Sequence, residues 1–191
     1  MQKIWLASGS PRRRELLAQL AVNFDVIKID VDESQLGNET ASAYVERLAK
    51  AKAQAGFVAG GAQLPALGAD TIVVVDGQVL GKPKDQTDFM RMMRLLQNRS
   101  HQVLTAVAIQ SAARLVHTTV CTDVWFGPMT EADMLAYWQS GEPADKAGGY
   151  GIQGLAGRFI EKIHGSYFAV VGLPLFETAA LLAQIEQKGL A

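Results

Sequence analysis

Residues 8–14 of the chain read Ser-Gly-Ser-Pro-Arg-Arg-Arg, and they join a short apolar segment to a helical pattern. The segment before them, residues 4–7, is typical of a buried strand. The segment after them, residues 15–20, carries leucines at helical spacing. Ser10 suits the capping position of a helix, and Pro11 suits the first helical position, where a missing N–H costs nothing. The stretch therefore predicts a strand, a tight turn and a helix that begins at Pro11.

Three consecutive arginines, Arg12, Arg13 and Arg14, occupy the first turn of this predicted helix. The N-terminus of a helix is already positive, so each exposed cation there costs about 0.3–1 kcal/mol. Free backbone N–H groups beside guanidinium groups are what a bound anion needs. We therefore expect a phosphate site at this helix start. The alternative is a solvated basic turn.

Length and composition limit the classes of protein. The chain has 191 residues, 49% of them hydrophobic and 19% charged, which suits a soluble globular protein with one core or two close-packed lobes. A net charge of −1 gives no overall attraction for nucleic acid or an anionic membrane. Cys121 is the single cysteine, which excludes an internal disulfide framework. No signal peptide or membrane span is recognisable, so we expect a cytoplasmic protein.

Asp70 begins an apolar run, residues 71–75, that is typical of a central strand. An unpaired carboxylate in a dry interior is costly, so Asp70 must meet a cation, a cluster of donors or a metal ion. The alternative is a buried cap satisfied by backbone N–H groups. Lys52 lies on the apolar stripe of a helix predicted over residues 40–55. Its ammonium group either snorkels to the edge of that stripe or points into an anion site.

An acidic loop that contains Asp32 and Glu33 follows a strand predicted over residues 24–31. Such carboxylates are either solvated or hold a hard cation.

The rest of the sequence predicts an alternation of strands and helices. Asp76-Gly77 between two apolar runs indicates a hairpin. Thr87 is expected to cap a helix to about Leu96, and residues 130–133 resemble the capping box of a helix to about Trp138. The side chains expected to face inward from the first of these helices are Phe89, Met92, Met93 and Leu96. Strands are predicted at residues 103–109, 115–124, 158–163 and 168–171. A terminal helix is predicted to bury Phe176, Ala180 and Ile185.

Two glycine-containing segments resemble nucleotide-binding motifs, but each lacks a feature that its motif requires. Residues 77–83 lack one residue of a Walker loop and place Pro83 where Ser or Thr should hold magnesium, which leaves Lys82 near the end of a strand. Residues 149–154 match G-x-G-x-x-G, but neither the preceding strand nor the following helix is expected. This second segment still suits the wall of a ligand site, and Gln153 offers both a donor and an acceptor to a base edge.

Taken in order, these segments resemble the Maf family of nucleoside triphosphate pyrophosphatases. The resemblance implies an elongated α/β fold similar to inosine triphosphatase, with a mixed twisted sheet flanked by helices. It implies one Maf-like domain over residues 1–191, built as two lobes with a cleft between them. The matching segments are residues 8–13, 68–71, 82–83, 145–148, 150–154, 165–167 and 171–174.

The resemblance also implies an activity, which is hydrolysis of a nucleoside triphosphate to its monophosphate and pyrophosphate. The intact segment 150–154 is similar to the branch that acts on dTTP and UTP, with modified pyrimidine nucleotides as further candidates. A divalent cation (Mg²⁺ or Mn²⁺), a homodimer and a role in clearing the nucleotide pool or in cell-division arrest are implied too. No nucleic-acid or membrane partner is expected.

The same resemblance assigns roles to individual residues. Asp70 matches the catalytic proton acceptor, and Lys52 and Lys82 complete the catalytic set. Glu33 and Asp70 match the metal site. The remaining matches are substrate-binding residues: Ser8 and Arg13 for phosphate, and Arg12, Thr71 and Gln153 for the choice of base.

Two other functions remain as alternatives. A regulator of septum formation would bind a nucleotide without turning it over, but simple binding needs no candidate base such as Asp70. Nucleic-acid binding is disfavoured by the net charge and by the lack of a long basic stripe.

Overall fold

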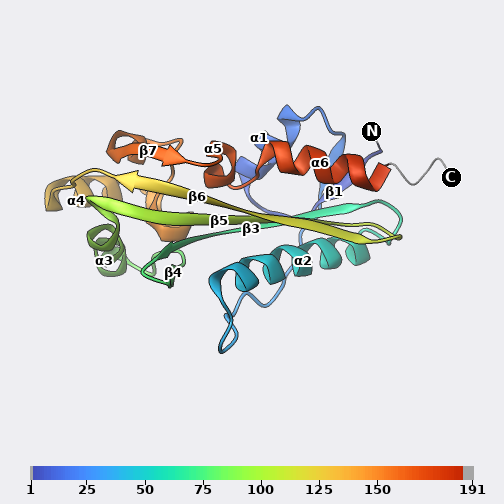
Figure 1. The fold of residues 1–191 in the computed structure, drawn as a ribbon, viewed down its shortest axis with the longest axis horizontal. Helices are drawn as coiled ribbons and strands as arrows, with labels where there is room; N and C mark the ends of the chain where they lie inside the picture. Colours follow the sequence, from blue (N-terminus) through green and yellow to red (C-terminus); the bar gives the residue numbers. More distant parts are fainter. Residues whose placement is uncertain (1, 187–191) are drawn as a thin grey trace. The chain divides into compact units, whose positions relative to one another are not determined.

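The computed structural model describes residues 2–186 and has the mixed α/β architecture expected from the sequence (Figure 1). Short 3₁₀ turns, labelled η, separate some of the elements. In chain order the elements are β1 (Ile4–Leu6), α1 (Pro11–Gln19), β2 (Phe24–Val26), α2 (Ala41–Ala59), β3 (Ala66–Val75), β4 (Gln78–Leu80), α3 (Gln86–Leu96), β5 (Arg99–Gln110), β6 (Leu115–Phe126), α4 (Glu131–Gln139), η1 (Glu142–Asp145), η2 (Ala147–Gly149), η3 (Leu155–Phe159), β7 (Ile160–His164), α5 (Tyr167–Val171) and α6 (Leu175–Glu186).

The strands form one seven-stranded mixed sheet in the order β2-β1-β3-β5-β6-β7, with β4 also paired to β3. Strand β1 is parallel to both neighbours, with Ile4 opposite Phe24 and Trp5 opposite Ala66. Strands β3 and β4 are antiparallel, as are β6 and β7. The prediction of a mixed sheet is therefore confirmed.

The chain divides into two compact units. The first contains the residues up to Asp70, residues 105–120 and the residues from Gly172 onward; the second contains residues 71–104 and 121–171. Strands β3, β5 and β6 each contribute residues to both units. The cleft expected between two lobes stays a prediction.

The first unit begins with the strand, turn and helix that the opening stretch predicts. Ser10 caps α1, since its Oγ accepts a hydrogen bond from the Arg13 N–H at 3.4 Å, and Pro11 is the first helical residue. Helix α1 has no acidic residue in its first turn. The positive helix start is thus reinforced by the arginines rather than offset, as an anion site requires.

Helix α2 packs very closely against the beginning of β3 in the first unit (Figure 1). A Cβ on Gly68 would lie 2.3 Å from the N atom of Ala53 and 2.5 Å from the carbonyl oxygen of Ala49. Only glycine allows this approach of strand and helix backbones. The contact fixes the position of α2 over β3.

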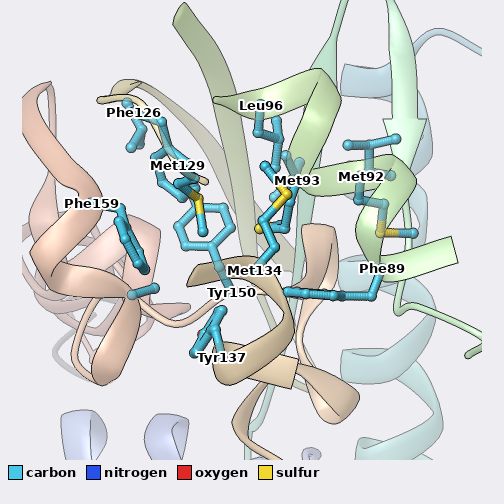
Figure 2. Packing of buried hydrophobic residues seen from close by; sticks show 14 of the residues in the cluster. Phe89, Met92, Met93, Leu96, Phe126, Met129, Met134, Tyr137, Tyr150 and Phe159 are labelled. Atoms are coloured by element: carbon cyan, nitrogen blue, oxygen red, sulfur yellow. The ribbon is translucent and has the colours of Figure 1, made fainter. Parts of the chain in front are cut away.

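The second unit has an aromatic and methionine-rich core (Figure 2). Phe89 and Tyr137 contact edge to face, with ring centroids 5.9 Å apart. The residues predicted to face inward from α3 are all buried there, and the methionines fill the gaps between rings. The labelled members of this core are Phe89, Met92, Met93, Leu96, Phe126, Met129, Met134, Tyr137, Tyr150 and Phe159.

Local turn chemistry is also confirmed in the second unit. Asp76 and Gly77 both have positive φ, 50° and 74°, as a two-residue hairpin between β3 and β4 requires. Thr130 and Asp133 form the predicted capping box of α4.

Several predicted elements are wrong in position or type. Strand β2 ends at Val26, so residues 27–31 are not a strand. Asp85, not Thr87, caps α3, because its carboxylate accepts the Asp88 N–H at 2.8 Å. Strand β7 begins at Ile160, after a 3₁₀ turn over residues 155–159.

The segment predicted as a strand at residues 168–171 is instead helix α5. Ser166 initiates this helix, since its Oγ accepts the Ala169 N–H at 3.2 Å and its carbonyl accepts the Val170 N–H. A local cap therefore overrides the strand propensity of the apolar residues.

The buried face of α6 also differs from the prediction. Phe176 and Ala180 are exposed and Ile185 is only half-buried, whereas Thr178, Leu181 and Leu182 are buried. Apolar residues occur all around this helix, so their spacing does not identify the inner face.

Candidate active site

The ammonium group of Lys52 contacts two carboxylates in the first unit. Its Nζ lies 2.6 Å from an Asp70 oxygen and 2.6 Å from a Glu33 oxygen. The two carboxylate oxygens can therefore be no farther apart than twice that distance. Lys52 and Asp70 are buried and Glu33 is exposed, so one buried cation holds together an interior acid and a surface acid.

The close packing at Gly68 explains how the sequence builds this pair. Alternate residues of a strand share a face, so Asp70 faces the same side of β3 as Gly68, toward α2. Lys52 adjoins Ala53, which lies against Gly68. The costly burial of the Asp70 carboxylate is offset by a cation, which is one of the partners that the sequence left open.

Arg13 and Ser8 form a second polar group at the start of α1. The Arg13 Nη1 donates to Ser8 Oγ at 3.3 Å, and Arg13 Nε donates to the Gly172 carbonyl at 2.9 Å. Ser8 Oγ also accepts the Ser10 N–H at 3.3 Å. These bonds fix the Arg13 guanidinium at the positive N-terminal end of α1.

Electrostatics connect this second group with the carboxylates. Burial lowers the pKa of the Arg13 guanidinium, and so does neighbouring Arg12; the nearby charges of Asp70 and Glu33 raise it. Arg13 stays charged because its ordinary pKa is so high. The first unit thus gathers Ser8, Arg13, Glu33, Lys52 and Asp70 in one charged site.

Two residues of α2 that sequence reasoning missed hold the loop of Glu33. The Tyr44 hydroxyl donates to the Glu33 carbonyl at 2.7 Å. Arg47 Nη2 donates to the Ser34 carbonyl at 2.9 Å, and its guanidinium pairs with Glu39 at 2.7 Å. Tyr44 and Arg47 are three residues apart and so share a helix face, which is the only signal the sequence offered.

The donor set suits a hard divalent cation. Glu33 and Asp70 supply carboxylate oxygens, which magnesium and manganese prefer, and Lys52 already brings these oxygens together. Within residues 2–186 no group of three or more His, Cys, Asp or Glu side chains is arranged to hold a metal. Two carboxylates fit a magnesium ion that completes its shell with phosphate oxygens and water.

The other predicted site residues lie partly outside this group. Arg12, half-buried, follows Pro11 in α1. Thr71, also half-buried, follows Asp70 in β3 but belongs to the second unit. Lys82 and Gln153 are exposed residues of the second unit, and their participation in the same site stays a prediction.

Within the second unit, the segments of Lys82 and of the glycine-rich loop are joined. The Gly148 N–H donates to the Gly81 carbonyl at 2.9 Å. Gly148 has φ +67°, and a Cβ there would lie 2.7 Å from the Val73 side chain. Residues 147–154 form 3₁₀ and other turns rather than a strand followed by a helix, so this segment is not a dinucleotide fold.

Comparison with known proteins agrees with this architecture. The chain is 55% identical over 179 residues to the dTTP/UTP pyrophosphatase of Pseudoalteromonas translucida, covering 94% of this chain and 95% of the relative. It is 54% identical over 182 residues to the dTTP/UTP pyrophosphatase of Vibrio vulnificus, covering 95% and 98%. A HAM1 protein from Coxiella burnetii has the same fold, with a TM-score of 0.54 at 16% identity over 96% of this chain and 100% of that one.

The family assignment rests on nearly the whole chain. Residues 3–185 match the family model described as Maf-like protein. The match includes both the charged site of the first unit and the glycine-rich loop of the second. The chain therefore belongs to the Maf family.

Proposed function

We propose that the protein hydrolyses dTTP and UTP to the monophosphate and pyrophosphate. Relatives more than half identical to this chain carry the name dTTP/UTP pyrophosphatase. The proposal is supported most by one observation: the Lys52 ammonium contacts both Asp70 and Glu33, whose charges also act on Arg13. Phosphoryl transfer needs cations that bind the phosphates and a carboxylate that accepts the proton of the attacking water.

The first role of the site is to bind the triphosphate. Arg13 and the N–H groups at the start of α1 would hold phosphate oxygens, with Ser8 orienting the guanidinium. Lys82 would add a further positive charge. Catalysis then comes mainly from position and electrostatics.

The second role is to activate water. In the proposed step the oxygen of a water molecule attacks the α-phosphorus and the bond to the bridging α–β oxygen breaks. Pyrophosphate leaves, and the proton of the water passes to the Asp70 carboxylate. Lys52 holds that carboxylate in position through its 2.6 Å contact.

Mg²⁺ or Mn²⁺ completes the proposed site. Glu33 and Asp70 would hold the ion, and the ion would neutralise negative charge on the phosphates. We further propose that Arg12, Thr71 and Gln153 select the base, that the enzyme is a cytoplasmic homodimer, and that it needs neither nucleic acid nor a membrane. Among residues 2–186, no helix is long and apolar enough to span a bilayer.

A panel assay tests the proposal. Purified protein with magnesium is incubated with dTTP, UTP, CTP, dATP and GTP, and pyrophosphate release is measured. We expect fast release from dTTP and UTP only. Binding of UTP without release would favour the alternative, a nucleotide-binding regulator of septum formation, and would overturn the enzyme assignment.

A further inference from the structure

Gln153 lies in the middle of a turn that is tied at both ends to two side chains outside it. The Gly151 N–H donates to the Tyr137 hydroxyl oxygen at 3.1 Å. The Leu155 N–H donates to Glu142 Oε2 at 2.9 Å. The Tyr137 O–H donates in turn to Glu142 Oε1 at 2.7 Å. The Glu142 carboxylate therefore holds both ends of the turn. It accepts the Leu155 N–H directly, and it holds the Gly151 N–H through the Tyr137 hydroxyl.

The turn that carries Gln153 closely encloses the Glu142 carboxylate. A Cβ on Gly154 would lie 2.3 Å from each carboxylate oxygen of Glu142, so the turn passes directly over it. Lys146 Nζ donates to the Glu142 carbonyl at 2.6 Å and so restrains the backbone of Glu142. Gln153 itself is exposed. Its backbone is thus restrained while its side chain faces solvent.

The tyrosine is suited to join the two groups. Tyr137 is 4% exposed and packs in the aromatic core beside Phe89 (Figure 2). Burial, and then the bond to Glu142, raises the pKa of its hydroxyl, so it stays a donor at neutral pH. Removing the Tyr137 hydroxyl would leave the Gly151 N–H without its acceptor. A donor that loses its partner in this way destabilises the folded protein.

The chain that enters the turn is anchored as well. Tyr150, which directly precedes Gly151, is buried, and its hydroxyl lies 2.6 Å from His101 Nε2. Both rings pack edge to face against Phe126. The turn therefore begins from a fixed point in the core of the second unit.

An amide that selects a base must be held in one orientation. Uracil and thymine present carbonyl acceptors on either side of an N–H donor, and cytosine presents a different pattern on the same edge. A freely turning glutamine amide can match either pattern by exchanging its oxygen and nitrogen. That rotation belongs to the side chain, so the contribution of the turn is to fix where the amide stands against the base edge. A shift of the turn weakens both hydrogen bonds of the preferred pattern.

We propose that Tyr137 and Glu142 are positioning residues for base selection, which hold the Gln153 turn so that its amide favours uracil and thymine over cytosine. The inference rests on the proposed function of this chain as a pyrimidine nucleoside triphosphate pyrophosphatase. Neither residue contacts the phosphates in this account. Their loss should change which base is accepted more than how fast the bond is cleaved.

The test compares Tyr137→Phe and Glu142→Gln with wild type on UTP and CTP. Each variant should lower the ratio of kcat/KM for UTP to that for CTP about tenfold, the effect of losing roughly one hydrogen bond of this kind. KM for UTP should rise while kcat changes little. Glu131→Gln is the matched control, because the Glu131 carboxylate forms a solvent-exposed pair with Arg94 at 2.7 Å. Its loss should leave the ratio unchanged.

Amide hydrogen exchange at Gly151 and Leu155 provides a readout that needs no turnover. Both amides should exchange faster in Glu142→Gln, while amides of α3 keep their wild-type rates. Unchanged UTP/CTP ratios in both variants, or a uniform loss of kcat on every triphosphate, would overturn the proposal. If wild type cleaved no triphosphate, the proposed function would fail, and UTP and CTP affinities of the same variants would still decide whether this turn selects the base.

Discussion

Lys52 and Asp70 form a buried ion pair in the first unit, with Nζ 2.6 Å from Oδ1. A second carboxylate, Glu33, reaches the same ammonium from the surface. The pair is possible because Gly68 lets β3 and α2 approach closely. The charges of Asp70 and Glu33 also act on the Arg13 guanidinium of α1. The proposed catalysis depends on this arrangement.

Replacing Lys52 by methionine should destabilise the protein and reduce activity. The change leaves the Asp70 carboxylate buried without its cation, and breaking a buried pair on one side costs about 3–5 kcal/mol. The free energy of unfolding is measured by urea denaturation. Lys50→Met on the same helix is the control, because its partially exposed pair with Glu46 should contribute only about 0.3–0.5 kcal/mol. Equal losses in both variants would contradict a special role for Lys52.

Replacing Asp70 by asparagine should abolish turnover while leaving UTP binding largely intact. The amide has nearly the same shape but does not accept the proton of the attacking water, and general bases contribute about 10²–10⁴-fold to rate. Steady-state hydrolysis and equilibrium binding of UTP are measured on the same preparation. Turnover near the wild-type rate would remove Asp70 from the mechanism.

Replacing Gly68 by alanine should impair both folding and activity. The new methyl group would meet the backbone of Ala53 at 2.3 Å, and forced overpacking costs about 1–3 kcal/mol. Displacement of α2 would also move Lys52 away from Asp70. Thermal denaturation and UTP hydrolysis report the two effects. Gly37→Ala is the control, since nothing lies within 4 Å of a Cβ at that position.

His101 should make the second unit less stable in mild acid. Burial, with a smaller contribution from Arg99, lowers its pKa to about 4 from an ordinary value of 6.5. The unfolded chain therefore binds more protons than the folded one between these values, so stability present above pH 6.5 is lost as pH falls toward 4. His101→Asn should show a shallower fall in melting temperature over this range than wild type. Parallel curves for the two proteins would show that His101 does not carry the effect.

Local chemistry explains why much of the fold was predictable. Ser10 with Pro11, Asp76 with Gly77, and Thr130 with Asp133 each specify a cap or turn through bonds within a few residues. The apolar residues around Asp70 predicted a buried carboxylate, and the apolar stripe of Lys52 allowed a buried ammonium group; both are buried. The pairing of the two across α2 and β3 was not predictable, because the sequence left several partners open for each residue.

Other features depend on contacts that sequence pattern does not encode. Five residues of α5 have strand composition, and only the Ser166 cap makes them helical. Phe176 is 83% exposed although it is the largest apolar side chain of α6. The bonds from Tyr44 to the Glu33 loop and from Glu142 to Leu155 join residues more than ten positions apart. Spacing within one helix or strand gives no information on such partners.

Isotope labelling shows which phosphorus atom the water attacks. UTP is hydrolysed by the wild-type protein with magnesium in ¹⁸O-labelled water, and both products are examined by mass spectrometry. Attack at the α-phosphorus predicts one ¹⁸O atom in UMP and none in pyrophosphate, with no labelled product from Asp70→Asn. Label in pyrophosphate or in inorganic phosphate would contradict the account, because water would then attack a different phosphorus atom.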